Sequence, residues 1–175
     1  MTVRTVRPEE HDALGAITVA AYRALLGPDM DAGYAHELAD VAGRAALVEV
    51  LVDIDAGGRL LGGITYIPGP GPMAWFVGAG EAGMRMLAVD PSAQGRGVGA
   101  RLVGACVDRA AGAGRARLLL HTTAPMTAAH RLYERAGFRR DPAHDELLAG
   151  GLELLAYALD LGGRVKSTRP GGGTG

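Results

Sequence analysis

The segment from Met84 to Arg101 constrains the fold of this chain more than any other part of the sequence. An apolar run ends at Val89, Pro91 interrupts it, and a turn with the sequence Gln-Gly-Arg-Gly-Val-Gly leads into an Ala-, Leu- and Val-rich stretch that is typical of a helix. A strand, a glycine turn and a helix N-terminus in this order bind phosphate, because backbone N–H groups and the helix dipole both point at the anion. The glycines allow close approach of the backbone, and Arg96 adds a charged contact.

Two frequent nucleotide-binding patterns do not fit this turn. The Walker pattern GxxxxGK[ST] needs a Lys and then a Ser or Thr, and neither follows Gly99. The dinucleotide pattern GxGxxG needs a different spacing from that of Gly95, Gly97 and Gly99. The pattern that remains is Gln94-x-x-Gly97-x-Gly99, which disfavours a protein that recognises ATP or NAD.

This pattern resembles the pyrophosphate loop of the GNAT superfamily of N-acetyltransferases, which bind acetyl-coenzyme A (acetyl-CoA). Residues 85–91, RMLAVDP, resemble the fourth strand of that family and its exit. Residues 129–138, AHRLYERAGF, resemble its coenzyme-side helix and the following Gly-Phe turn. Two motifs in the right order argue against an ordinary glycine-rich turn. The resemblance covers residues 84–140, the half of the family's domain that binds the coenzyme.

The resemblance implies an α+β (mixed α/β) fold. Its central, mostly antiparallel sheet would have roughly six or seven strands, a splay between the fourth and fifth, and about four flanking helices. Strands are expected at residues 2–7, 46–54, 59–67, 84–89, 117–122, 138–141 and 151–159, and helices at 8–26, 34–42, from the glycine turn to about 113, and at 126–136. We expect one domain over residues 1–161 and a disordered tail at 162–175, which has few apolar residues.

Composition and charge narrow the class of protein. A formal net charge of −1 gives no sign of nucleic-acid binding. The one cysteine, Cys106, excludes a disulfide framework, and its place in a helical pattern favours a buried structural thiol. No apolar run reaches transmembrane length and the N-terminus does not resemble a signal peptide, so we expect a cytoplasmic protein with neither a membrane nor a metal partner. Its 17 arginines against one lysine are typical of a GC-rich bacterial genome.

The resemblance assigns acetyl-CoA binding to two segments. In the glycine turn the residues are Gln94, Gly95, Arg96, Gly97, Val98, Gly99 and Ala100. In the fourth strand they are Leu87, Ala88 and Val89, whose backbone would bind the pantetheine amides like an added strand. The N–H group of Leu87 is also implied as a donor to the acetyl oxygen. The alternative is an ordinary strand with a fully paired backbone.

Tyr133 is implied to act on the leaving thiolate. In the matching motif this tyrosine lies near the thioester sulfur, and a phenol with an ordinary pKa of about 10 stays protonated at neutral pH. The resemblance therefore implies a catalytic acid, or a group that only orients the sulfur. The structural alternative is a tyrosine packed on the apolar face of its helix beside Leu132.

The group that takes a proton from the amine is less defined. Histone-acetylating members use a strand glutamate, but the matching position here is Gly83. Glu81, two residues earlier and on the same face of the strand, is the candidate base, unless it is a solvated charge. His121, at the end of an apolar run, is a second candidate because histidine titrates near neutral pH, with a structural role as the alternative.

A second departure from the family concerns an Asn that contacts the coenzyme in many members. Met126 occupies that position, so the backbone, Thr127 or His130 would replace the contact. His130 is also a candidate for the coenzyme phosphates, and a solvent-exposed helix histidine is the alternative.

The resemblance places the acceptor near the first two helices, the fourth strand and the connection between the last two strands. It nominates Tyr22, Tyr34, His36, Trp75, Phe76, Asp141, His144, Asp145 and Glu146. The acids would attract an ammonium group or be merely solvated. The aromatic pair would line an apolar pocket, pack in the core or form a dimer contact. The chain is expected to be a monomer or a homodimer.

Two functions therefore compete. One is an N-acetyltransferase that moves an acetyl group from acetyl-CoA to a primary amine, of a small molecule or a protein, by direct attack in a ternary complex. The other is a coenzyme-A-binding regulatory or vestigial domain without transfer activity. Tyr133 favours the enzyme, whereas the missing strand glutamate and Asn keep the other function open.

Overall fold

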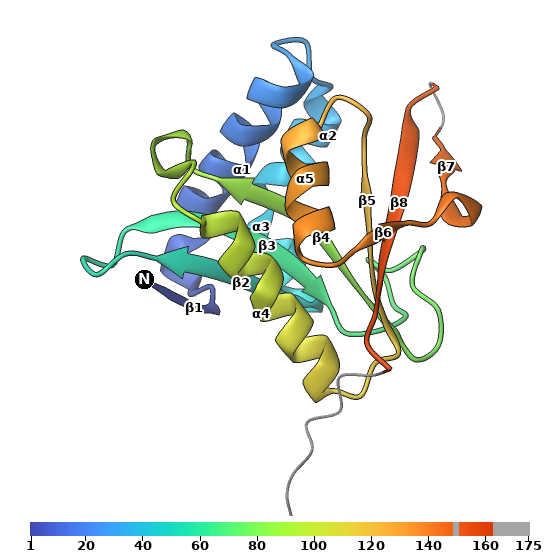
Figure 1. Cartoon of the computed structure of the whole chain (residues 1–175). Coiled ribbons are helices and arrows are strands. Elements are labelled where there is room, and N and C mark those ends of the chain that lie inside the picture. The colour runs from blue at the N-terminus through green and yellow to red at the C-terminus, as the bar shows by residue number, and fades with distance from the viewer. Residues whose placement is uncertain (149–150, 163–175) are drawn as a thin grey trace, which may run out of the picture.

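The computed structural model describes residues 1–148 and 151–162, which form eight strands and five α-helices (Figure 1). The strands are β1 (Thr2–Thr5), β2 (Glu49–Ile54), β3 (Leu60–Ile67), β4 (Glu81–Val89), β5 (Arg117–Thr122), β6 (Arg139–Arg140), β7 (Glu146–Leu147) and β8 (Glu153–Asp160). The α-helices are α1 (His11–Leu26), α2 (Ala32–Ala39), α3 (Val41–Leu47), α4 (Val98–Gly112) and α5 (Thr127–Arg135). Short 3₁₀ turns occupy Pro8–Glu10, Pro91–Ala93 and Pro142–His144.

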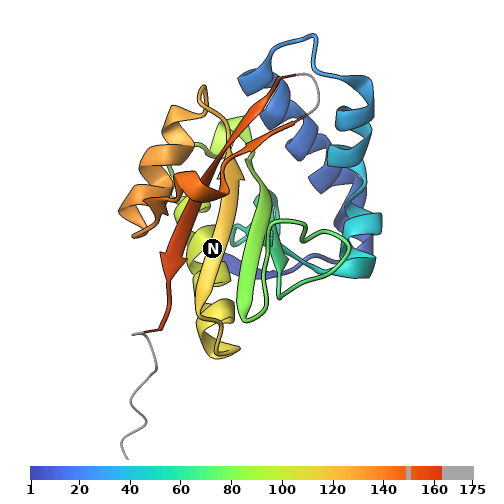
Figure 2. The same cartoon turned by 90° about the vertical axis from the view of Figure 1, so that its right-hand side faces the viewer.

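The strands form one sheet in the order β1-β2-β3-β4-β5-β8-β6, and β7 pairs with β8. The pairs are antiparallel apart from β4 and β5, which are parallel. Helices α1, α2 and α3 cover one face of the sheet, and α4 and α5 cover the other (Figure 1, Figure 2). The expected α+β class and the mostly antiparallel sheet are confirmed. No helix in residues 1–148 or 151–162 is long and apolar enough to cross a membrane.

The structure differs from the sequence-based prediction in the numbers of strands and helices and in several element boundaries, with β4, for example, beginning at residue 81 and not at 84. The additional strand is β7, which has two residues, and the strand expected at 138–141 is present as the two-residue β6. Both lie in a polar stretch that shows no clear alternation. The additional helix is α3, and residues 46–47, expected in a strand, form its end. Asp40 begins this helix directly after α2 by accepting a hydrogen bond of 2.8 Å from the N–H of Gly43. The expected tail lies outside the described residues from residue 163 onward.

The parallel pair β4–β5 opens along its length. In the described structure, β4 pairs with β5 over residues 81–83, opposite residues 117–119. Beyond that point β5 pairs with β8 as far as Thr122, while β4 stays paired with β3 as far as Val89. The later residues of β4 therefore face a gap, which is the predicted splay between the fourth and fifth strands.

A β-bulge in β4 accompanies this splay. The register between β3 and β4 shifts between Gly63 and Thr65, and Met86 lies opposite the shift with a φ of +54°. A positive φ is strained for a residue other than glycine, and an extra residue in one strand bends it away from its neighbour. The bulge thus helps to keep the gap between β4 and β5 open.

Helix α4 fixes the glycine turn to the sheet. Its buried side chains are Val98, Leu102, Val103, Cys106, Val107 and Ala110. They form one apolar stripe that packs on the main core together with residues of β3, β4 and β5. Cys106 is fully buried, and burial raises the pKa of its thiol to about 12, which fits the structural role expected for it.

Candidate functional site

A cavity of about 620 Å³ occupies the gap between β4 and β5. Its lining residues are Tyr22, Leu26, Met30, Asp31, Tyr34, Ile64, Trp75, Phe76, Met84, Arg85, Met86, Leu87, His121, Thr122, Thr123, Met126, Tyr133, Leu148, Leu152 and Leu154. Tyr133 comes from α5 on one face of the sheet, whereas Tyr22 and Tyr34 come from α1 and α2 on the other. The cavity therefore connects the two faces of the sheet.

The glycine turn lies between the end of β4 and the start of α4. Gly95 and Gly97 have φ angles of +73° and +74°, which glycine adopts without strain. Residues 94–97 and Ala100 are exposed, whereas the side chain of Val98 is buried. The first N–H groups of a helix have no acceptor within the helix, so this turn offers several backbone donors and the positive end of the α4 dipole.

Gly99 sets the distance between α4 and α5. A Cβ atom built at this position would lie 3.0 Å from Cδ2 of Leu132 in α5. That contact is tighter than ordinary van der Waals packing, so glycine allows the two helices to flank the turn closely.

Arg101 ties the glycine turn to the sheet. Its Nη1 donates to the carbonyl oxygen of Arg96 at 3.0 Å, and its Nε donates to Oδ2 of Asp53 at 2.7 Å. Asp53 lies in β2 and has no exposed surface. One guanidinium therefore holds the turn in place and also balances the negative charge of a buried carboxylate.

We expect Arg101→Met to lower the free energy of unfolding by roughly 3 kcal/mol, because it leaves the carboxylate of Asp53 buried without a partner. Urea unfolding followed by circular dichroism measures this loss. The matched control is Arg23→Met, which removes an exposed guanidinium from α1 and should change stability by less than about 0.5 kcal/mol. Equal stabilities of the two variants would contradict the role given to Arg101.

The open edge of β4 directs backbone groups into the gap. The N–H of Asp90 donates to the carbonyl oxygen of Leu61 in β3 at 2.9 Å. Successive strand residues point their backbone groups to opposite sides, so Ala88 also faces β3 while Leu87 and Val89 face the gap. The two residues implied as pantetheine partners thus lie with their N–H groups on the open edge.

Tyr133 lies on the same side as the glycine turn. Its ring packs near Phe138 and Tyr157, with centroids 6.0 and 6.3 Å away, and the residue is only 7% exposed. Burial raises the pKa of its phenol above the ordinary value. The hydroxyl of this cavity-lining residue therefore stays protonated and can donate a hydrogen bond.

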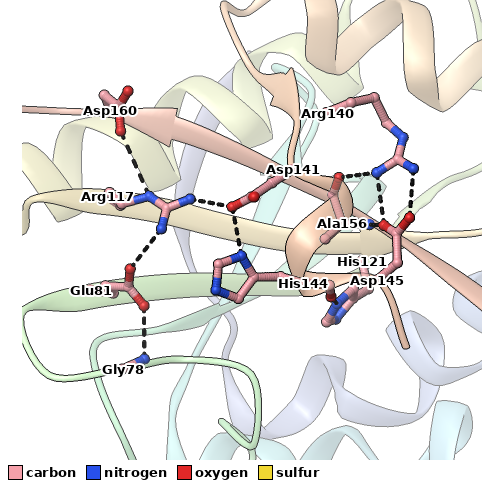
Figure 3. A network of polar contacts seen from close by, with 10 residues as sticks. All are labelled: Gly78, Glu81, Arg117, His121, Arg140, Asp141, His144, Asp145, Ala156 and Asp160. Atoms are coloured by element: carbon pink, nitrogen blue, oxygen red, sulfur yellow. Dashed lines mark hydrogen bonds and ion pairs between the residues drawn. The ribbon is translucent and has the colours of Figure 1, made fainter. Parts of the chain in front are cut away.

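Glu81 lies at the closed end of the β4–β5 pair and is not among the described residues that line the cavity. Its carboxylate accepts hydrogen bonds from the N–H of Gly78 at 2.9 Å and from Nη1 of Arg117 at 3.2 Å (Figure 3). Arg117 also pairs with Asp141 and Asp160, so this ion-pair cluster joins β4, β5 and β8. The structure gives Glu81 structural partners and does not bring it to the other candidate site residues.

His121 of β5 lines the cavity on the α1–α2 side. Its Nε2 is 2.9 Å from the backbone carbonyl oxygen of His144 (Figure 3), and its ring packs edge-on against Phe76, with centroids 4.9 Å apart. A carbonyl oxygen only accepts, so Nε2 carries the hydrogen and Nδ1 of the neutral ring keeps a lone pair. Nδ1 is buried and has no hydrogen-bond partner among the described residues.

His130 and Met126 occupy the start of α5. Nε2 of His130 is 2.9 Å from the carbonyl oxygen of Thr123, which links α5 to the end of β5. Met126 lines the cavity, and its Sδ accepts a hydrogen bond of 3.6 Å from Oγ1 of Thr122. Thr127 is exposed.

The structure divides the residues nominated for the acceptor into two groups. Tyr22, Tyr34, Trp75 and Phe76 line the cavity. His36, Asp141, His144, Asp145 and Glu146 are not among its described lining residues. Asp141 and Asp145 form ion pairs with Arg117 and Arg140 instead (Figure 3).

Arg85 and Asp31 line the cavity but were not nominated from the sequence. A sequence signal existed for Arg85, since it is a charged residue within the otherwise apolar run of the fourth strand. Asp31 had no comparable signal, because an acid just before a helix is an ordinary cap. It does cap α2, accepting a hydrogen bond of 2.8 Å from the N–H of Tyr34.

A model of the Acetyltransferase (GNAT) family matches residues 15–138, which is more than half of the chain. The chain belongs to the GNAT acetyltransferase family, and the resemblance drawn from the glycine turn is confirmed. A search of curated protein sequences gives no match.

Solved structures of the same fold come from several bacteria. A GNAT-family acetyltransferase of Staphylococcus aureus Mu50 has a TM-score of 0.71 at 13% identity, over 91% of this chain and 98% of that one. An acetyltransferase of Salmonella typhimurium, solved with its cofactor acetyl-CoA, has a TM-score of 0.63 at 18% identity, over 97% and 96%. A phosphinothricin acetyltransferase of Sinorhizobium meliloti in complex with acetyl-CoA has a TM-score of 0.63 at 17% identity, over 97% and 92%.

Proposed function

We propose that this chain is an N-acetyltransferase that moves the acetyl group of acetyl-CoA to a primary amine by direct attack in a ternary complex. The observation that carries the proposal is the cavity in the β4–β5 gap, whose lining residues come from both faces of the sheet. Two substrates that enter from opposite faces would meet in the gap, which is the arrangement direct attack requires. Membership of the family and the acetyl-CoA bound in two similar structures support acetyl-CoA as the donor.

The residues on the α4–α5 side suit acetyl-CoA. The exposed turn from Gln94 to Ala100 offers N–H donors and a helix N-terminus to the pyrophosphate. The edge of β4 at Leu87 and Val89 offers main-chain groups to the extended pantetheine amides. We assign the N–H of Leu87 to the acetyl oxygen, where it would stabilise the negative charge that develops during attack.

In the proposed reaction the amine nitrogen attacks the thioester carbonyl carbon, the C–N bond forms and the C–S bond breaks. A lysine-like amine with an ordinary pKa of about 10.4 is neutral in only about one molecule in 2,500 at pH 7, so a base is needed. We propose that Nδ1 of His121 is this base and accepts the proton of the amine, either directly or through one water. Glu81, the first candidate from the sequence, is engaged by Arg117 outside the cavity.

Tyr133 is proposed to stabilise the departing thiolate. The ordinary pKa of a thiol is about 8.5, which is below that of this buried phenol, so the shared proton stays mainly on the tyrosine oxygen. Tyr133 therefore acts by donating a hydrogen bond to the thiolate, which takes its own proton from water on release.

We expect Tyr133→Phe to lower kcat by about 10- to 30-fold, because a hydrogen bond to a charged sulfur is lost. The dissociation constant for acetyl-CoA should stay within about twofold, since the ring contacts with Phe138 and Tyr157 remain. Steady-state kinetics and calorimetry measure the two quantities. Tyr157→Phe removes a neighbouring hydroxyl that lies 3.5 Å from Glu134 and serves as the control. An unchanged kcat for Tyr133→Phe would remove its proposed role.

Calorimetric titration with acetyl-CoA, coenzyme A, ATP and NAD tests the donor. We expect saturable binding of acetyl-CoA and coenzyme A. The dissociation constants of ATP and NAD should be at least about 100-fold higher, which corresponds to about 2.7 kcal/mol of binding free energy. Preference for ATP or NAD would overturn the proposal. Tight binding of acetyl-CoA without turnover over a broad amine panel would favour a regulatory domain that binds coenzyme A.

A further inference from the structure

The acceptor half of the cavity is largely apolar and aromatic. Tyr22 and Tyr34 form one wall, with ring centroids 6.0 Å apart, and Trp75 and Phe76 contribute a second pair at 5.2 Å. Burial raises the pKa of Tyr22 and Tyr34, so both phenols stay uncharged. Such walls suit an apolar or aromatic side chain better than a polycation.

Of the described residues that line this cavity, Asp31 and Arg85 carry the formal charges. One acid and one guanidinium in an apolar wall complement a molecule that carries an ammonium group and an anion together. An α-amino acid is such a molecule, and it reacts through its amine once a proton has been removed.

The guanidinium of Arg85 has N–H donors available to bind an anion. Its guanidinium carbon lies 4.3 Å from the ring centroid of Trp75, and its side chain is 18% exposed. Its ion pair in the described structure joins Nη2 to Oε1 of Glu37 at a long 3.4 Å, and the side chain of Glu37 is 49% exposed. A guanidinium has five N–H donors, and its planar fork matches the two oxygens of a carboxylate.

Neighbouring residues hold this guanidinium in place. The indole Nε1 of Trp75 donates to Oε2 of Glu146 at 2.8 Å, which fixes the ring on which Arg85 stacks. Stacking on an aromatic ring leaves the edge of the guanidinium available for hydrogen bonds. The weak contact with the exposed Glu37 is replaced by an incoming carboxylate at little cost.

Arg85 is also close to the proposed reacting centre. It precedes Leu87 by two residues in β4, which is roughly 7 Å along a strand. The β-bulge at Met86 directs both Arg85 and Met86 toward α1 and α2, where Arg85 meets Glu37 and Met86 packs with Tyr22. A carboxylate bound at Arg85 would therefore leave an amine a few bonds away within reach of the gap.

We infer that the acceptor is an amine that also carries a carboxylate and an apolar body, in the simplest case an apolar α-amino acid, and that Arg85 binds its carboxylate. This inference rests on the proposed acetyltransferase function. It assigns Arg85 a role in specificity, beside the residues proposed for the chemistry.

The test compares two acceptors that share a phenyl ring and an amine. L-Phenylalanine carries the carboxylate, and phenethylamine lacks it. Release of coenzyme A from acetyl-CoA is measured with the wild type, with Arg85→Met, which keeps an apolar stem against Trp75, and with Arg23→Met, which removes an exposed guanidinium from α1. L-Leucine, L-methionine and spermidine complete the panel.

We expect the wild type to have a kcat/KM for L-phenylalanine at least about tenfold higher than for phenethylamine. Arg85→Met should remove this preference by raising KM for the amino acid about tenfold or more, with phenethylamine changed by less than about twofold. Arg23→Met should behave as the wild type. Because each variant is compared on both substrates, the difference in amine basicity cancels.

The inference is overturned if the wild type prefers phenethylamine or spermidine, or if Arg85→Met slows both phenyl substrates equally. In those cases the acetyltransferase proposal survives, since an amine is still acetylated. If acetyl-CoA binds and none of the five amines is acetylated, both the inference and the proposed function fail.

Discussion

Gly97→Glu is expected to abolish acetyl-CoA binding, with the dissociation constant raised at least about 100-fold. Gly97 is the N-cap of α4 and has a φ of +74°, so a residue with a Cβ is strained at this position. That Cβ would also lie 3.2 Å from Nη1 of Arg101, which holds the turn. The added carboxylate would then repel the phosphates at the point where the helix dipole attracts them.

Two control variants separate the possible causes. Gly97→Ala introduces the backbone strain without the charge and should weaken binding less. Gly112→Glu adds the same charge at the far end of α4, roughly 20 Å along the helix, where the added Cβ meets open space. Calorimetry gives the three affinities, and circular dichroism verifies folding. A folded Gly97→Glu variant that binds acetyl-CoA within about threefold of the wild type would remove the turn from the coenzyme site.

His121→Gln is expected to lower kcat/KM about 100-fold near neutral pH and to change the shape of its pH profile, because a variant without the base depends on the neutral form of the amine alone. A protonated imidazole cannot accept the proton of the amine, so the wild type and the variant differ in how activity responds to acidic pH. The glutamine side chain can still donate to the carbonyl oxygen of His144 but offers no basic nitrogen. The loss therefore separates a chemical role of His121 from a structural one.

The matched control for this variant is His11→Gln, at the first residue of α1 and outside the described lining of the cavity. Its pH profile should coincide with that of the wild type. Initial rates from pH 5.5 to 9.5, at saturating acetyl-CoA, give both profiles. A pH profile of His121→Gln that runs parallel to that of the wild type would return His121 to a structural role and leave the proton to water.

The structure of the segment assigned to the coenzyme was predictable because its signals are local. The turn from Gln94 to Gly99 can bind a phosphate group only if it follows a strand and begins a helix. The structure has β4 before the turn and α4 after it. Tyr133, nominated from the motif around it, lines the cavity. Helix α3 was not predicted and β2 was placed too early, because a capping residue, Asp40, starts a helix inside a stretch of apolar residues that also suits a strand.

The acceptor half depends on contacts between residues far apart in the sequence. Glu81 and Arg117 become partners because β4 and β5 pair in parallel at that end, which the periodicity of either strand does not reveal. Nδ1 of His121 keeps its lone pair because Nε2 donates to the carbonyl oxygen of His144, which lies 23 residues away in the sequence. Arg85 turns toward α1 and α2 through a bulge at Met86, and apolar side chains alone do not predict a bulge.

The most direct test of acetyl transfer is mass spectrometry of an amine panel after incubation with the protein and acetyl-CoA carrying a ¹³C-labelled acetyl group, with coenzyme A release followed in the same reactions. We predict that coenzyme A release depends on the amine and that the label appears on the amine nitrogen, first on apolar amino acids. Coenzyme A release that is independent of every amine, or labelled acetate as the sole product, would contradict this prediction.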